Sequence, residues 1–165
     1  MAKKPLNRDL QFVSFFVSGD MYGLDIQIVK EVNPNITISN VPLSKDVIRG
    51  LVNIRGQIVL VMDIAVVFGQ EARTVTGESQ LIILKTAQEI QQISLVDLEI
   101  NCDLFGDKPI AFLVDSIGDV VTIPEVNIEP TPPHIDEGNA SFIKGVSKLG
   151  DKLISILNAE EMIAA

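Results

Sequence analysis

The stretch that decides the fold is Val47–Asp63, which reads Val-Ile-Arg-Gly-Leu-Val-Asn-Ile-Arg-Gly-Gln-Ile-Val-Leu-Val-Met-Asp. Two short apolar runs flank Asn53–Gly56, and Gly56 lies where a tight turn needs a permissive backbone. Ile58–Met62 is a continuous apolar run that is too short for a typical helix and suits a buried strand. The stretch therefore predicts a β-hairpin. The guanidinium of Arg55, at the turn, either points into solvent or is presented to a partner as a fixed donor fork.

The composition favours a single β-rich domain. The chain has 165 residues, which is one domain's worth of length. Apolar residues make up 47% of it, but aromatic residues only 5%, with no Trp. The core must therefore consist mainly of Val, Ile and Leu, and the branched residues among them favour strands.

The charge and the apolar runs exclude two classes of partner. The net charge is −9, so the surface repels phosphate backbones and nucleic acid is not expected as a partner. The longest apolar run, Ile58–Phe68, is interrupted by Asp63 and is shorter than a membrane-spanning helix. We therefore expect a cytoplasmic protein that does not insert directly into a membrane.

The residues that could carry chemistry do not form a recognisable constellation. Cys102 is the only Cys and His134 the only His, and acidic neighbours at Glu99 and Asp103 disfavour a reactive thiolate. Four carboxylates stand isolated within apolar segments, without metal-ligand spacing: Asp25, Asp63, Asp115 and Asp119. Since no phosphate-binding glycine loop is present either, we expect no catalytic residue, no cofactor and no metal site.

The second half of the chain repeats the first. Tyr22–Val32 matches Ile110–Val120 in residue type at a constant offset of 88, and Val47–Leu51 matches Phe142–Val146 at an offset of 95. The landmarks keep their order, which is expected when two units share one backbone and pack on each other. The sequence therefore predicts a duplicated β fold.

Local patterns add three expectations. Residues 11–17 form a strand, and a second strand begins at Tyr22. The alternation of apolar residues slips after Ile28, which predicts a bulge or a short helical turn. Asn158 is suited to cap a short C-terminal helix that has Glu160 and Glu161 in its first turn.

One motif of the predicted hairpin is distinctive, Arg49-Gly-x-x-Asn-x-Arg-Gly56. It occurs together with Phe12-x-x-Phe15, Tyr22-Gly-Leu-Asp-Ile26, Val29-x-Glu-Val32, Leu113-Val-Asp-x-Ile-x-Asp-Val120, Ile128-x-Pro130 and Phe142-Ile-Lys-Gly-Val146. With these motifs the chain resembles, over nearly its whole length, the family of bacterial chemotaxis coupling proteins, the CheW family, and the hairpin motif is the most specific element of the resemblance.

The resemblance implies a mostly β fold of two five-stranded SH3-like barrels related by a pseudo-twofold axis, with short helices including one at the C-terminus. A single domain would span residues 8–160. One subdomain would take residues 22–78 plus the C-terminal helix, and the other residues 8–20 and 79–157.

The resemblance also implies a non-catalytic function. Family members couple the cytoplasmic tip of a chemoreceptor to the regulatory domain of the chemotaxis histidine kinase, at the membrane-associated receptor array, where self-association is also conceivable. The kinase contacts use the apolar ends of the barrels. Carried over by motif position, the receptor groove between the barrels would take Val29, Glu31, Gly50, Arg55, Leu81, Ala111, Ile117 and Val120.

Two departures from the family pattern leave alternatives open. The chain inserts residues 85–108 where the family has a short turn, and Ile93, Leu95, Leu98 and Ile100 in this insertion could extend a hairpin or cover a barrel. Val32-Asn33-Pro34 stands where the family commonly has an Arg after the acidic residue. The alternative functions are an adaptor of a related pathway such as surface or twitching motility, a stand-alone kinase regulatory domain, and an enzyme with a pocket around Cys102 or His134.

Overall fold

The computed structural model of the chain describes residues 8–34, 36–42, 44–92, 106–130 and 141–164. The strands are β1 (Asp9–Val17), β2 (Asp20–Asp25), β3 (Val29–Asn33), β4 (Ile48–Ile54), β5 (Gln57–Asp63), β6 (Gln80–Leu84), β7 (Ile110–Val114), β8 (Ser116–Pro124), β9 (Ile143–Leu149) and β10 (Lys152–Leu157). The helices are all short: η1 (Ile26–Ile28), α1 (Ile64–Val67), α2 (Ala87–Gln91), η3 (Glu125–Asn127) and α4 (Ala159–Ile163).

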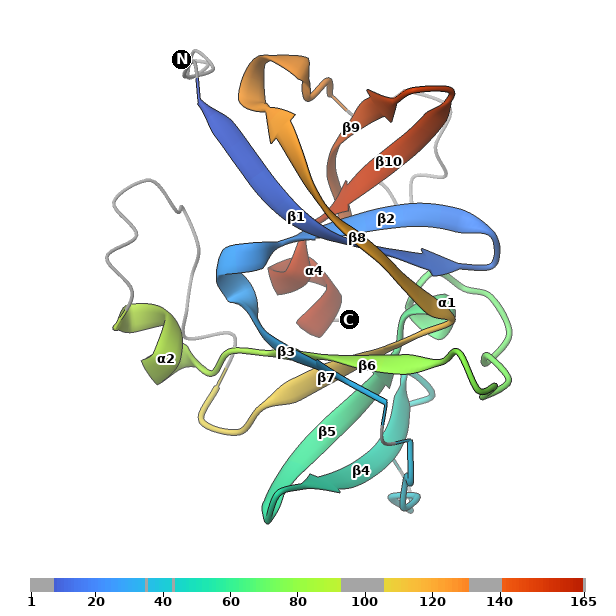
Figure 1. The fold of residues 1–165 in the computed structure, drawn as a ribbon. Coiled ribbons are helices and arrows are strands. Elements are labelled where there is room, and N and C mark those ends of the chain that lie inside the picture. Colours follow the sequence, from blue (N-terminus) through green and yellow to red (C-terminus); the bar gives the residue numbers. More distant parts are fainter. Residues whose placement is uncertain (1–7, 35, 43, 93–105, 131–140, 165) are drawn as a thin grey trace.

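The described strands form two five-stranded sheets, and Figure 1 shows one sheet above the other. The β1 sheet has the strand order β8-β1-β2-β10-β9, and the β6 sheet has the order β3-β6-β7-β5-β4. Each sheet is antiparallel except for one parallel pair, β2 with β10 and β5 with β7. The predicted hairpin of Val47–Asp63 is the antiparallel pair β4–β5. The prediction of a mostly β fold is confirmed.

The two sheets have the same topology. Replacing β1–β5 by β6–β10, and the reverse, converts one strand order into the other. The register agrees residue by residue, since Leu60 pairs with Ile110 in one parallel pair and Ser155 pairs with Tyr22 in the other. These are equivalent positions at the offsets of 95 and 88, so the repeat found in the sequence is the repeat of the structure.

The two halves of the chain exchange strands. The first half gives β1 and β2 to the β1 sheet and β3–β5 to the β6 sheet, and the second half does the reverse. The sheets divide the chain differently from the expected subdomains, 22–78 with the C-terminal helix and 8–20 with 79–157. β2 lies in one sheet with β1, while β6 and β7 lie in one sheet with β3–β5. The chain crosses between the sheets after β2 and after β7.

Neither sheet closes into the expected barrel. The outer strands of each sheet are not joined by a ladder, and a single β-bridge per sheet, Ser39 with Leu51 and Glu129 with Val146, brings the chain after β3 or β8 to the opposite edge strand. Each bridge carries two backbone hydrogen bonds of 2.8–2.9 Å. Within the described residues, the two edges of each sheet are thus linked only through this one bridge, and the sheet stays open.

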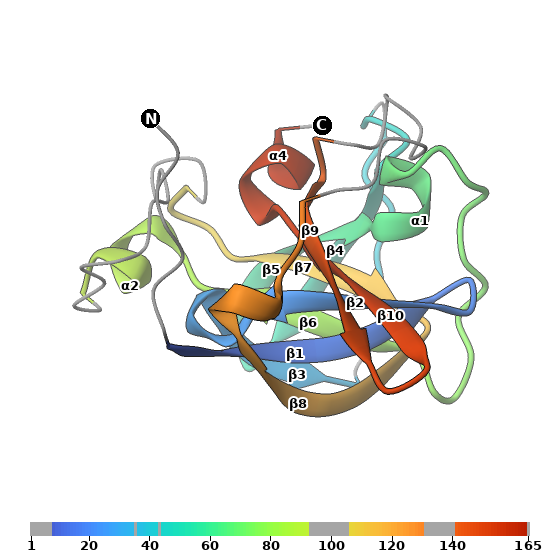
Figure 2. The same cartoon turned by 90° about the horizontal axis from the view of Figure 1, so that it is seen from above.

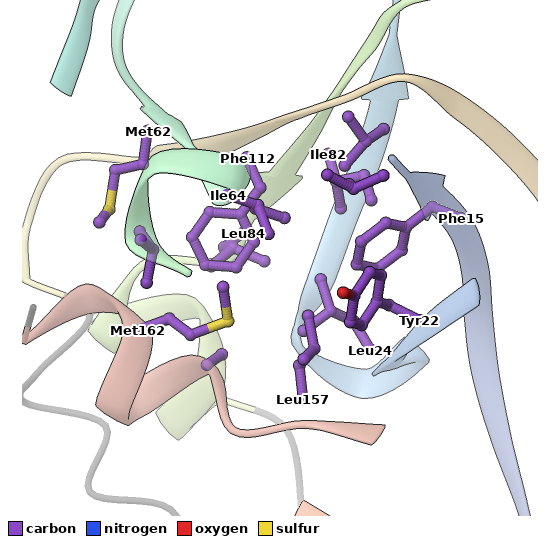
Figure 3. Close-up of a cluster of buried hydrophobic side chains, with 14 of the residues drawn as sticks. Phe15, Tyr22, Leu24, Met62, Ile64, Ile82, Leu84, Phe112, Leu157 and Met162 are labelled. Atoms are coloured by element: carbon purple, nitrogen blue, oxygen red, sulfur yellow. The ribbon is translucent and has the colours of Figure 1, made fainter. Parts of the chain in front are cut away.

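The sheets pack face to face across a shared core (Figure 3), which we call the seam core. It is made of buried side chains from both sheets and from α1, α2 and α4: Phe15, Val17, Tyr22, Leu24, Ile28, Met62, Ile64, Ala65, Val67, Phe68, Ile82, Leu84, Ile90, Phe112, Val114, Leu157, Ala159 and Met162. Each sheet also encloses a smaller cluster on its other face, with Leu81 and Ala111 in the β6 sheet and Phe12 and Ile154 in the β1 sheet. Because each sheet has a buried cluster on both of its faces, a strand such as β6 is apolar on both faces.

The short helices fasten chain ends and crossings to the seam core. The predicted C-terminal helix is α4, and the side chain of Asn158 accepts a hydrogen bond from the backbone N–H of Glu161 at 3.4 Å, as expected of an N-cap. In the 85–108 insertion, α2 begins with a capping box of Thr86 and Glu89 and buries Ile90 in the seam core. The apolar residues Ile93, Leu95, Leu98 and Ile100 of the insertion lie outside the described residues.

Candidate functional site

The edge strand β8 carries a bulge that gathers two candidate residues on one face. Phe15 pairs with Ile117 and Val13 pairs with Val120, so two residues of β8, Gly118 and Asp119, lie opposite Ser14 alone. The hydroxyl of Ser14 donates a hydrogen bond to the carbonyl oxygen of Asp119 at 2.5 Å. Residues three apart in a regular strand point to opposite faces, but the bulge places Ile117 and Val120 on the same face.

The edge strand β3 carries a bulge at the equivalent place. Val29 pairs with Leu84, and Glu31 pairs with Ile83, the neighbour of Leu84, so Lys30 is the extra residue. Val29 and Val32 therefore both lie opposite residues of the seam core, Leu84 and Ile82. The slip of the apolar pattern after Ile28 is thus explained by both of the predicted features, the helical turn η1 and this bulge.

The two bulges bring four aliphatic side chains to the border of the seam. Val29, Val32 and Ile117 are partly buried against the seam core, whereas Val120 is 51% exposed. Figure 2 shows β3 and β8 on one side of the molecule, opposite α1 and α4. This side of the seam is bordered by two sheet edges, and we call it the β3–β8 face, defined by Val29, Val32, Ile117 and Val120.

Charged groups lie next to this face, at the β4–β5 turn. Arg55 has a positive φ of 50°, and its side chain is 70% exposed and forms an ion pair with Glu31 of β3. The neighbouring turn residue Gly56 donates its backbone N–H to the side chain of Asn53 at 2.8 Å. The hydrogen bond from Arg55 lowers the pKa of Glu31 below its usual value, burial opposes this effect, and the hydrogen bond with Asn33 adds a smaller lowering. Glu31 therefore stays ionised at neutral pH.

A shallow cavity of about 180 Å³ lies beside this ion pair. Its polar rim is formed by Lys30, Glu31, Arg55 and Gln57, and its apolar lining by Ile54, Val59 and Ile83. The cavity is too small for a substrate of ordinary size but large enough for one aliphatic side chain of a partner.

Three of the residues expected in the groove are not on the surface. Leu81 and Ala111 are fully buried, in the cluster on the face of the β6 sheet that points away from the seam core. Gly50 is buried in β4, and a Cβ there would collide with the backbone of Ser39. The sequence could not show this, because strands that are buried on both faces have no polar side to mark the surface. Val29, Glu31, Arg55, Ile117 and Val120, by contrast, are at least partly accessible.

Val32 is the residue of this face that the sequence analysis missed. It is the equivalent of Val120 at the offset of 88, and this correspondence was the available signal.

Three of the four carboxylates considered for chemistry stabilise the fold. Asp25 caps η1 by accepting from the N–H of Gln27 at 2.9 Å. Asp63 caps α1 and pairs with Arg49 at 2.9 Å, and Asp115 pairs with Arg73 at 2.8 Å. Within the described residues, no group of three or more His, Cys, Asp or Glu side chains could hold a metal ion. Cys102 and His134 lie outside the described residues.

None of the described helices is long and apolar enough to cross a bilayer.

Comparisons with known proteins agree with the fold. The model of the CheW-like domain matches residues 11–165. The chain is 23% identical over 155 residues to the chemotaxis protein CheW of Klebsiella aerogenes, covering 94% of this chain and 82% of that protein. It is 24% identical over 156 residues to CheW of Thermotoga maritima, covering 94% and 89%. The crystal structure of the scaffolding protein TtCheW from Thermoanaerobacter tengcongensis matches with a TM-score of 0.72 and 30% identity, covering 92% of this chain and 90% of that one. The chain therefore belongs to the CheW-like family of chemotaxis coupling proteins.

Proposed function

We propose that this protein is a non-catalytic adaptor that binds the cytoplasmic tip of a chemoreceptor and the regulatory domain of the chemotaxis histidine kinase, and so couples one to the other. Membership of a family of chemotaxis scaffolds supports the proposal. The single observation that carries it is the β3–β8 face, where two bulged edge strands leave aliphatic side chains at the border of the seam.

The receptor tip binds at this face. Val29, Ile117 and Val120 supply apolar contact to the helical hairpin of the receptor, since burial of apolar surface contributes about 25 cal/mol per Å². Leu81 and Ala111 support the surface from behind, because Leu81 pairs with Asn33 of β3 and Ala111 pairs with Ile83. Gly50 acts in the same indirect way, by allowing the backbone at Ser39 to approach β4.

Arg55 and Glu31 set the register of the receptor. Arg55 is the more exposed partner of the pair, so its free donors can bind a receptor carboxylate while Glu31 holds the guanidinium in place. Charged contacts at the rim of an interface contribute to specificity and to the rate of association more than to affinity.

The kinase regulatory domain binds at the ends of the two sheets. Ile58 at the start of β5 is 48% exposed and Leu153 at the start of β10 is 50% exposed. They are equivalent at the offset of 95, so each sheet presents one aliphatic side chain beside its hairpin turn. The resemblance implies kinase contacts at apolar ends without naming residues, and we propose Ile58 and Leu153 for them. Bound to both partners, the protein is held at the cytoplasmic side of the membrane.

The proposal is tested by reconstitution. A receptor signalling fragment, the kinase and this protein are mixed, and kinase autophosphorylation is measured together with direct binding by calorimetry. The Arg55→Ala variant is expected to weaken receptor binding on the order of tenfold, as for an interface hot spot. Arg8→Ala is the matched control, because it removes the same charge from an ion pair with Glu125 at the edge of the β1 sheet. Equal receptor affinity of the two variants would refute the site, and failure of the unmodified protein to bind receptor or kinase would refute the function.

An adaptor of a related motility pathway is the second candidate. The observation that favours it is the insertion, since Glu89 of α2 pairs with Lys30 of β3 at 3.1 Å and so brings an added element beside the proposed receptor strand. Binding measured against receptor fragments from both kinds of pathway separates the candidates.

A further inference from the structure

The segment that joins the two halves of the chain is held at Arg73 and, more weakly, by a hydrogen bond that the Ser18 hydroxyl donates to the Gln70 side chain at 2.7 Å. Between α1 and β6, the residues 69–78 are exposed apart from Arg73. Arg73 makes hydrogen bonds with both its backbone and its side chain. Its N–H donates to Asp63 Oδ2 at 2.9 Å, its carbonyl accepts from Arg49 Nη1 at 2.8 Å, and its guanidinium donates to Asp115 through Nε at 2.9 Å.

The backbone of Arg73 is tied to the β6 sheet. Asp63, at the end of β5, is fully buried, and its carboxylate also accepts from Arg49 and from the N–H of Ala65. A buried carboxylate with several donors holds them firmly, because each lost bond would leave charge unpaired in the interior. The backbone of Arg73 is therefore held in place independently of its side chain.

The side chain of Arg73 reaches the point where the chain crosses between sheets. Asp115 is the single residue between β7 of the β6 sheet and β8 of the β1 sheet. Its carboxylate takes two donors from Arg73, at 2.9 and 2.8 Å. It also accepts from the backbone N–H of Ser18 in the β1–β2 turn at 2.9 Å. We call Arg73 with Asp115 the crossing clasp.

The equivalent crossing in the first half is built differently. At the offset of 88, the position of Asp115 is occupied by Gln27, within η1. Both crossings have a backbone hydrogen bond, from Lys85 N to Ile28 O at 2.9 Å and from Asp115 N to Phe16 O at 3.0 Å, but the first is held in addition by the cap of Asp25 on η1. A helical turn thus stiffens one crossing, while a charged clasp performs the same task at the crossing that has no turn.

We infer that Arg73 is a positioning residue for the β3–β8 face. The clasp holds the first residues of β8, so that Ile117 stands at a fixed distance from β3 across the seam. This inference rests on the proposed function for its consequence in binding. Its structural content does not depend on any partner.

The test uses backbone NMR of the full chain, without a partner. Arg73→Met removes the guanidinium but leaves the backbone N–H and C=O that bind Asp63 and Arg49. The matched control is Glu125→Gln, which breaks an ion pair of similar exposure, Arg8 with Glu125 at 2.7 Å, at the far end of β8. We expect lower order parameters and altered residual dipolar couplings at residues 115–120 in Arg73→Met, and no change there in Glu125→Gln. Couplings at 115–120 that are the same in Arg73→Met as in the unmodified protein would overturn the inference.

The binding arm then separates this inference from the proposed function. Receptor affinity of Arg73→Met is expected to fall about two- to fivefold, the range that corresponds to an ion pair of this exposure. Arg73→Lys, which keeps the charge but not the fork, should recover part of the loss. Loosening of β8 without any change in affinity would refute the positioning role. Failure of the unmodified protein to bind the receptor would refute the proposed function, while the NMR comparison still decides whether the clasp holds β8.

Discussion

Replacing Gly50 by Ala tests whether this glycine shapes the fold or contacts the receptor. Gly50 has a φ of 142°, in a region that is essentially reserved for glycine. A Cβ at this position would also collide with the carbonyl group of Ser39 and lie 2.7 Å from Cγ2 of Ile38. The bridge between Ser39 and Leu51 has to open to relieve the collision.

The expected cost follows from these two effects. Backbone strain contributes about 1–3 kcal/mol, and loss of the two bridge hydrogen bonds, each 2.8 Å long, contributes about 1 kcal/mol apiece. The free energy of unfolding should therefore fall by about 3–5 kcal/mol, which lowers the melting temperature of a chain of this size on the order of 10 °C.

The assay is urea and thermal unfolding with two glycine controls. Gly56→Ala imposes a positive φ of 85° but meets nothing within 4 Å, so it should cost only about 1–2 kcal/mol. Gly145→Ala, the equivalent of Gly50 in the second half, places a Cβ 2.7 Å from the carbonyl oxygen of Glu129 and should be intermediate. If Gly50→Ala is no less stable than Gly56→Ala, the argument is wrong. Lost receptor binding in a fully folded Gly50→Ala protein would point to direct contact instead.

Three further predictions concern other residues of the site and the core. Glu31→Gln should be less stable than the unmodified protein at neutral pH, and the difference should vanish in acid. The reason is that the pKa of Glu31 is lower in the folded protein than in the unfolded chain. The ionised carboxylate therefore stabilises the fold above the unfolded-state pKa, and this stabilisation is lost as the pH falls through the folded-state pKa. Urea titrations from about pH 7 to about pH 3 that show a constant difference would contradict it. Asp63→Ala leaves Arg49 without its buried partner and should lower the free energy of unfolding by about 3–5 kcal/mol. Asn158→Ala, at the equivalent cap, should lower it by about 1 kcal/mol. Similar melting temperatures for the two variants would be contrary evidence. Val120→Ser should change stability by less than about 1 kcal/mol and weaken receptor binding, while Leu81→Ala should cost about 2–5 kcal/mol in stability. Calorimetry showing normal receptor affinity for Val120→Ser would remove Val120 from the site.

The sequence predicted the repeat and the main hairpin because both depend on local spacing. The offsets of 88 and 95 reappear as strand register, in the pairs Leu60 with Ile110 and Ser155 with Tyr22. The division between sheets could not be predicted in the same way, because it depends on where the chain crosses, and a crossing such as Asp115 differs from an ordinary loop residue only in its partners.

The candidate site was predicted in part for a related reason. Glu31 and Arg55 are charged, Val120 holds a motif position of the resemblance, and the structure leaves all three at least partly accessible. Leu81 and Ala111 share the same apolar character as Val120 but face inward. Arg73 gave no signal at all, because it lies in a polar connector and its partners are 10, 24 and 42 positions away in the chain.

The exchange of strands between the two halves has a consequence for how such a fold can arise. A single half, taken alone, would have its first two strands and its last three in different sheets, each lacking neighbours. Only a second copy could supply them, so the ancestral unit would have been an interlocked homodimer with its symmetry axis passing through the seam core. Fusion of two such chains would leave the two hairpin turns free to diverge, as they have here, into one with a cation at Arg55 and one with Gly150 at the equivalent position.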